Sequence, residues 1–251
     1  TSNWEAAGRL IQEKYLLTNS SNAEATFDKL TFDDNTGWNT HNGYDSVWQS
    51  WMWKRHAGFD VVTYSGTGSS QNLRHGLGKS VEMGWIKCRS NASTNWSVWH
   101  KDIPDKYILV NTNGQAQSAG ATRSVSSTHY EAFNWNDEGA SGRTYIAMLF
   151  ASVDGISKVG SYTGNGSTGQ TITLGFQPRF VIIRKYNDAS NWLVLDTTRG
   201  WGSGDDKYLL LNSTGAQGNY EVGAPVSNGF TLVGDNDYNN SSGAYIYYAH
   251  A

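Results

Sequence analysis

The sequence predicts an all-β protein built from tandem antiparallel β-sandwich repeats of the jelly-roll type. Glycine is frequent (28 residues), and aromatic residues make up 13% of the chain, with 11 Trp and 14 Tyr. Short aromatic and β-branched runs alternate with turns rich in Gly, Asn and Ser, which is typical of strands joined by tight loops. No window shows a convincing apolar period of 3.6 residues, the pattern that favours helices. Such strands would form two sheets packed face to face.

Three stretches resemble one another and define a repeat of about 100 residues, the size of a domain. Each stretch has an Asn-Trp pair followed by a Lys-Tyr strand that ends near an Asn. The copies begin at Asn3-Trp4, Asn95-Trp96 and Asn191-Trp192, and lead to Lys14–Asn19, Lys106–Asn111 and Lys207–Asn212. We therefore divide the chain into residues 1–57, 58–154 and 155–251.

Residues 58–154 and 155–251 are whole copies, and their strands can be placed in order. Tyr145–Ala151 is apolar throughout, which predicts a central strand buried on both faces. The other strands expected in the first copy are Asp60–Ser65, Val81–Lys87, Trp96–Lys101 and Tyr107–Asn111. Those expected in the second are Phe180–Ile183, Trp192–Leu195, Tyr208–Leu211 and Phe230–Val233.

Residues 1–57 carry only the back half of a repeat. Residues 6–14 could form a short helix, but the register with the other copies favours a loop followed by a strand. Trp48–Trp53 is expected to be the last strand of this half. A half-domain would leave strand edges and an open core. We therefore expect the chain to be a piece of a longer repeat protein, or expect strands of another chain to complete the half.

Charge and cysteine content exclude several classes of function. The net charge of −3 gives no basic field for nucleic acid or an anionic membrane. No stretch approaches the length of apolar sequence that spans a bilayer, about 18 residues. Cys88 is the one cysteine, so no internal disulfide forms, and its apolar surroundings predict a small buried side chain.

Loop residues of the repeats provide candidates for ligand binding. Trp201, Trp135 and Tyr238 could stack on sugar rings, while the side chains of Asp235, Asp237 and Asn239 contact hydroxyl groups. Anchoring of loops is the alternative role of the aromatic residues. Asp235, Asp237 and Asn239 alternate oxygen ligands, as a calcium loop does. The Gly and the later Glu of an EF-hand are absent, and a polar hairpin loop is the alternative interpretation. Apart from this possible calcium ion, we expect no cofactor.

Enzymatic motifs are missing. The sequence has no His-Glu-x-x-His metal motif and no Gly-x-Ser-x-Gly nucleophile motif. Glycoside hydrolysis needs two carboxylates facing each other across a cleft. The candidates for such a pair lie in no recognisable motif: Glu82, Glu131, Asp137 and Glu138.

Several segments of the second copy resemble repeats in tail-fibre and other virion proteins of marine bacteriophages. These segments are Gly155–Ser167, Gly175–Arg184, Asp196–Trp201 and Asn228–Leu232. The first copy departs from the pattern, since Ser80 falls near the place of Pro178 and the Arg-Gly-Trp turn is absent. The resemblance implies concanavalin- or laminin-G-like jelly rolls in a virion or extracellular setting. It carries over no catalytic residues.

The expected function is therefore that of a non-enzymatic virion or tail-fibre structural protein that contributes to attachment to host-surface glycans. Its partners would be further copies of itself or other virion proteins. A free or cell-surface lectin is the alternative, and a polysaccharide-cleaving enzyme on the same fold is a more distant one, because jelly rolls host all three functions.

Overall fold

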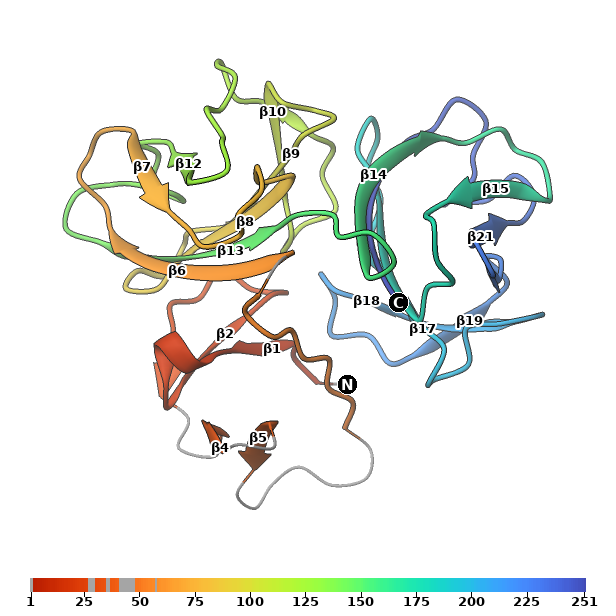
Figure 1. Cartoon of the computed structure of the whole chain (residues 1–251), viewed down its shortest axis with the longest axis horizontal. Helices are drawn as coiled ribbons and strands as arrows, with labels where there is room; N and C mark the ends of the chain where they lie inside the picture. The colour runs from red at the N-terminus through yellow and green to blue at the C-terminus, as the bar shows by residue number, and fades with distance from the viewer. Residues whose placement is uncertain (1, 27–29, 35–36, 41–47, 57) are drawn as a thin grey trace.

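A computed structural model describes residues 2–26, 30–34, 37–40, 48–56 and 58–251. The molecule has three lobes (Figure 1). Residues 58–154 form the upper left lobe, residues 155–251 the upper right lobe, and the described residues of 2–56 lie below them. Among the described residues no helix is long and apolar enough to cross a membrane. The predicted all-β class and its antiparallel sheets are confirmed.

The first whole copy contains a large sheet and a small sheet. The large sheet has the order β11-β10-β9-β8-β13-β6, and the small sheet pairs β12 with β7. The strands are β6 Phe59–Ser65, β7 Gln71–Arg74, β8 Met83–Cys88, β9 Trp96–His100, β10 Lys106–Leu109, β11 Gln117–Ser118, β12 His129–Ala132 and β13 Thr144–Phe150.

The second copy repeats this order. Its large sheet runs β14-β22-β16-β17-β18-β19, which places its strands in the same sequence as those of the first copy read from β6 to β11. The small sheet has the order β15-β21-β20. The strands are β14 Ser157–Thr163, β15 Gln170–Thr173, β16 Phe180–Lys185, β17 Leu193–Asp196, β18 Asp206–Leu210, β19 Gly218–Tyr220, β20 Pro225–Val226, β21 Gly229–Leu232 and β22 Ala244–His250.

The described part of residues 2–56 has a smaller sheet, with the order β1-β2-β3. This sheet matches β9-β10-β11 and β17-β18-β19, since the Asn-Trp and Lys-Tyr sequences begin equivalent strands in all three. A 3-10 turn, Arg9–Ile11, lies between β1 and β2, so the loop-and-strand interpretation is confirmed over the helical one. The strands are β1 Glu5–Ala7, β2 Lys14–Leu17, β3 Ala25–Thr26, and the hairpin of β4 Leu30–Asp34 and β5 Gly37–Thr40.

The strand predicted at Trp48–Trp53 is wrong, because these residues form no strand. Trp51 and Trp53 pack instead on the second copy. Trp51 stacks on Trp4 and lies 5.9 Å from Phe180, while Trp53 lies 5.5 Å from Phe180. The indole N–H of Trp53 also donates to the hydroxyl of Tyr248. The apolar pattern of this segment thus reflects side chains that cover a neighbouring lobe rather than a strand in a sheet.

The central strands of each large sheet are buried on both faces, which explains their continuous apolar sequence. In β13, Tyr145, Ala147 and Leu149 point into the core between the two sheets of the first copy. The alternate residues Ile146 and Phe150 point the other way, into a core shared by all three lobes. The strand β22 alternates in the same manner between the core of the second copy and the shared core.

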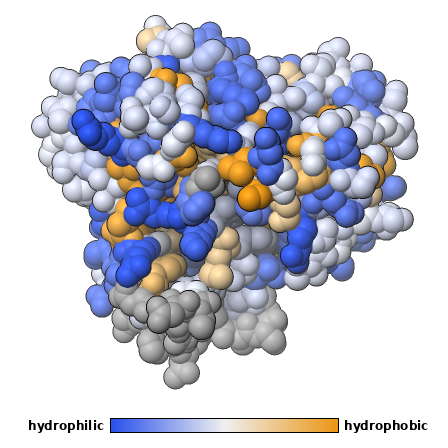
Figure 2. Space-filling view, in the orientation of Figure 1, coloured by the Kyte–Doolittle hydropathy of each residue, from blue (hydrophilic) through white to orange (hydrophobic). Residues whose placement is uncertain are grey.

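The shared core lies where the three lobes meet. It contains Leu16 of β2, Trp96 and Ile108 of the first copy, and Trp192 and Leu211 of the second. On the face shown in Figure 2, apolar residues form a band across the middle of the molecule, bordered by hydrophilic residues of the upper lobes. Since one apolar cluster includes residues from every lobe, the lobes pack as one body.

Candidate functional site

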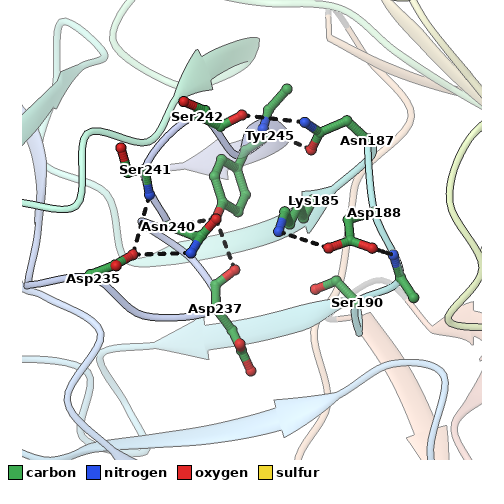
Figure 3. Close-up of polar contacts among 12 residues, drawn as sticks. Lys185, Asn187, Asp188, Ser190, Asp235, Asp237, Asn240, Ser241, Ser242 and Tyr245 are labelled. Atoms are coloured by element: carbon green, nitrogen blue, oxygen red, sulfur yellow. Dashed lines mark hydrogen bonds and ion pairs between the residues drawn. The ribbon is translucent and has the colours of Figure 1, made fainter.

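The loop between β21 and β22 contains the residues predicted to bind calcium, and Figure 3 shows Asp235 and Asp237 among them. One oxygen of the Asp235 carboxylate accepts hydrogen bonds from the side-chain amide of Asn240 at 3.1 Å and from the backbone N–H of Ser241 at 3.2 Å. The Tyr245 hydroxyl donates to the backbone carbonyl of Asp237 at 3.0 Å. It also accepts the backbone N–H of Asn240, so it holds both sides of the loop.

Asn239 is buried and its amide is fully used within the protein. Its side-chain oxygen accepts the backbone N–H of Asn165, and its NH₂ group donates to the carbonyl of Ser167. Calcium requires six to eight oxygen ligands. In the part of the chain that the structure describes, no three His, Cys, Asp or Glu side chains gather as a metal site would need. The residues therefore do not fit a calcium site, and the polar hairpin loop is the better interpretation.

A second polar contact in Figure 3 comes from the end of β16. The ammonium group of Lys185 lies 3.2 Å from the carboxylate of Asp188, which is largely exposed. Asn187 accepts the backbone N–H of Ala244 and donates to the carbonyl of Ser242, so this loop is tied to the start of β22. These contacts stabilise the turn after β16. The side chains that make them bind one another and the backbone, and they do not converge on a common ligand position.

Two of the three predicted stacking residues are buried. The side chain of Trp201 is 3% exposed, and its indole N–H donates to the carbonyl of Gly223 at 2.7 Å. Tyr238 is buried in the same core. Neither ring presents a face to a sugar, so this prediction is wrong for both residues, and the loop-anchoring alternative describes them. Trp135 is half-buried and packs against Tyr107 and Phe133, with ring centroids 5.0 and 4.9 Å apart.

The carboxylates considered for glycoside hydrolysis all bind groups of the protein. Glu82 lies 3.0 Å from the ammonium of Lys101. Asp137 accepts the backbone N–H of Asn95 at 2.7 Å, and Glu131 accepts that of Ser124 at 2.8 Å. These contacts fix loops and strand ends.

Glu138 belongs to a buried ion pair that the sequence analysis missed. Both of its oxygens bind the guanidinium of Arg123, at 2.9 and 3.0 Å, and both side chains are 1% exposed. The hydroxyl of Ser97 and the backbone N–H of Phe133 also donate to this carboxylate. The second copy has Tyr238 at the position that matches Glu138. A carboxylate in one copy and an aromatic residue at the same position of the other is the sequence signal that could have pointed to this pair.

Neighbouring lobes are joined by the same contacts at two places. The indole N–H of Trp96 donates to the carbonyl of Leu17 at 2.8 Å, and that of Trp192 donates to the carbonyl of Leu109 at 2.8 Å. In both cases the tryptophan begins its own lobe's strand and the acceptor ends the Lys-Tyr strand of the preceding lobe.

A buried cation and a backbone hydrogen bond complete each joint. Lys87 reaches the carbonyl of Ser21 at 3.3 Å, and Arg184, at the matching place in β16, donates to the carbonyl of Gly114. Burial lowers the pKa of Lys87 to about 8 and that of Arg184 to about 10. The backbone N–H of Glu24 donates to the carbonyl of Arg89, and the backbone N–H of Ala116 donates to the carbonyl of Tyr186, both at 2.8 Å.

An asparagine pair supports each tryptophan from within its own lobe. Asn111 accepts the backbone N–H of Trp96 at 3.0 Å and donates its NH₂ group to Asn95 at 2.9 Å. The equivalent contacts join Asn19 to Trp4 and Asn3, and Asn212 to Trp192 and Asn191. These pairs explain why the Asn-Trp and Lys-Tyr…Asn sequences recur together.

Comparison with known protein families gives one match, which covers nearly all of the chain. Residues 11–251 match a family model described as a domain of unknown function (DUF7483). No curated protein and no solved structure matches the chain significantly. The match runs through all three lobes, as does the shared core.

Proposed function

Because the chain belongs to the DUF7483 family, whose description names no activity, we propose from the geometry that it is a non-enzymatic structural protein of a bacteriophage virion, of the tail-fibre type. The observation that carries this proposal is the joint between lobes, which is built twice from matching residues. A structural protein needs its repeats fixed relative to one another.

The joints include buried apolar packing, whereas ordinary contacts between domains are more polar and permit motion. Each one combines an indole donor, a buried cation and a backbone hydrogen bond. The shared core adds apolar packing, with the rings of Trp85 and Trp192 only 5.9 Å apart across the two whole copies. Burial of such aromatic side chains contributes about 1.5–3 kcal/mol each.

The state of the carboxylates supports a non-enzymatic role. A general acid and a general base must both reach the substrate. Glu138 is enclosed in its ion pair, and Glu82 is bound by Lys101 and by the backbone N–H of Ser152 at 2.7 Å. Burial alone would raise the pKa of Glu82, but the hydrogen bonds from Ser152 and Lys101 hold it below its usual value. That carboxylate is therefore ionised and held in place, which suits a structural contact.

The experiment is to raise an antibody against residues 1–251 and to probe gradient-purified phage particles, with mass spectrometry as a second readout. We expect the protein in the particle fraction and a symmetric oligomer of the purified chain by light scattering. A monomer found on cell surfaces or in the medium, and absent from particles, would favour the lectin. Release of reducing ends from a polysaccharide panel by the purified chain would overturn the non-enzymatic assignment.

A further inference from the structure

A basic groove lies mainly on the first copy, where Leu10 and Arg55 of the preceding lobe border it. One hollow of about 390 Å³ is lined by Leu10, Arg55, Asp60, Arg74 and His75 together with the backbone of β6. A second, of about 330 Å³, is lined by Asn72, Arg74, Thr128 and His129. Arg74 lines both, so the two hollows border one guanidinium group. Both are shallow and open to solvent, which suits a ligand that stays partly exposed rather than one that is enclosed.

The one carboxylate that lines this groove is already neutralised. Asp60 accepts the Nε–H of Arg55 at 2.6 Å and the backbone N–H groups of Val61 and Gly76 at 2.8 and 2.6 Å. Burial by itself would raise the pKa of Asp60, but the bonds from Gly76 and Arg55 hold it below its usual value. Asp60 therefore stays ionised and paired, and adds little net negative charge to the groove.

Arg74 is exposed and, within the described ranges of the chain, its guanidinium makes no hydrogen bond or ion pair, while its main chain belongs to the β7–β12 ladder. It is thus available to an external anion. His129, opposite Arg74 in the strand register, is held by the hydroxyls of Ser126 and Ser124 at 2.7 and 3.2 Å. The groove therefore offers one unpaired guanidinium beside a fixed imidazole.

Both walls of the groove are edges of sheets. β6 is the last strand of the large sheet, and β7 pairs with β12 alone among the described strands (Figure 1). Backbone N–H and C=O groups on the outer side of an edge strand have no partner in the ladder. Such groups suit the donors and acceptors of sugar hydroxyls.

The second copy shows that the fold does not require these charges. Arg74 pairs with His129 across β7 and β12, and at the same place in β15 and β21 Thr173 pairs with Gly229. Leu174 stands where the first copy has His75. A matched scaffold thus lacks the guanidinium of Arg74 and the imidazoles of His75 and His129 at these three positions, so these side chains are a property of the first copy.

We propose that this groove binds an acidic oligosaccharide, with Arg74 pairing to a sugar carboxylate and the edge strands β6 and β7 contacting the hydroxyl groups. Guanidinium matches a planar carboxylate in a bidentate pair. The described lining contains no Trp, Tyr or Phe ring, so recognition rests on charge and hydrogen bonds rather than on stacking against such rings. This inference is independent of the virion assignment, since it concerns the first copy whatever assembly contains it.

The test is isothermal titration of residues 1–251 with trigalacturonic acid, with its neutral methyl ester as the matched ligand. We compare Arg74→Gln with Lys207→Gln, which removes an exposed cation of the second copy. We expect the acid to bind, the ester to bind at least tenfold more weakly, and Arg74→Gln to lose about 10- to 100-fold in affinity. Lys207→Gln should bind like the parent protein. Because Arg74 is exposed, both variants should melt like the parent, which separates loss of binding from loss of folding.

Three results would overturn the proposal. The acid and the ester could bind equally, or Arg74→Gln could bind like the parent, and either would remove the role of the guanidinium. Tighter binding of a sulfated trisaccharide, or of an acidic peptide of equal charge, would show that the groove selects another anion.

Discussion

The indole N–H of Trp192 donates to the main-chain carbonyl of Leu109 at 2.8 Å, across the boundary between the two whole copies. The side chain of Trp192 is 2% exposed and also belongs to the shared core. Trp96 makes the same bond to Leu17 at the previous boundary. At each boundary, a tryptophan at the start of one lobe's strand thus also binds the end of the Lys-Tyr strand in the preceding lobe.

The first prediction tests this bond separately from the ring. Trp192→Phe keeps an aromatic side chain but leaves the Leu109 carbonyl without its donor, so we expect a loss of about 1–3 kcal/mol in the free energy of unfolding. Trp192→Ala also leaves a cavity and should cost about 3–5 kcal/mol. Urea denaturation measures both. The control is Trp135→Phe, at a half-buried ring, and an equal loss in that variant would contradict the role of the joint.

The second prediction concerns cooperativity. Leu16, Trp96 and Trp192 come from three lobes but lie in one apolar cluster. We therefore expect a single calorimetric transition for residues 1–251, with equal calorimetric and van't Hoff enthalpies. Residues 58–251 should melt at a lower temperature and expose apolar surface to a dye, because Trp51 and Trp53 no longer cover Phe180. Three separate transitions would show that the lobes are independent.

Much of the fold could be predicted from the sequence because the repeated motifs allow the copies to be aligned with one another. The strands predicted near Asp60, Tyr107, Phe180 and Tyr208 all form, and so does the strand at Tyr145 that is buried on both faces. Glycine-rich turns and apolar runs are local signals, so they do not depend on how the lobes pack. The buried place of Cys88 followed from the same pattern.

The sequence could not show how the lobes pack, and the errors arise there. Trp51 and Trp53 resemble strand residues, yet their side chains cover another lobe. The apolar pattern of a short segment does not show whether its side chains pack within a sheet or against a distant part of the chain. Trp201 lies in a polar loop of the sequence, but that loop folds back and buries its indole. The sequence does not indicate the basic groove, because Arg55 and Arg74 line the same hollow only in the folded chain.

The third prediction concerns acid stability and follows from His100. Its side chain is fully buried, and burial lowers its pKa to about 4. In the unfolded chain a histidine binds its proton near pH 6.5. Between these values the unfolded state binds more protons, so acidification from pH 6.5 towards 4 should cost up to about 3 kcal/mol, and the contribution is complete above pH 6.5.

The test for His100 is urea unfolding at several pH values. His100→Asn retains an acceptor near Nδ1, which accepts the backbone N–H of Asp102 at 3.2 Å, but it does not titrate. We expect a flatter pH profile between 4 and 6.5 in this variant than in the parent protein. Equal slopes for the parent and His100→Asn would show that other groups cause the acid sensitivity.

The last prediction addresses the buried pair of Arg123 and Glu138. Glu138→Ala leaves the guanidinium of Arg123 buried without its carboxylate, and it removes the acceptor of Ser97 and of the Phe133 N–H. Breaking such a pair from one side costs about 3–5 kcal/mol, whereas replacing both partners by apolar residues of similar volume is often neutral. We therefore expect Arg123→Met with Glu138→Leu to recover most of the stability that Glu138→Ala loses.

The second copy supports this expectation, since it places the apolar ring of Tyr238 where the first has Glu138 and encloses it in the same kind of core. Thermal unfolding of the single and double variants, combined as a double-mutant cycle, gives the coupling energy. If the double variant is less stable than Glu138→Ala, the pair contributes beyond charge compensation. Its hydrogen bonds to Ser97 and Phe133 would then be what holds the loop before β13 against β9.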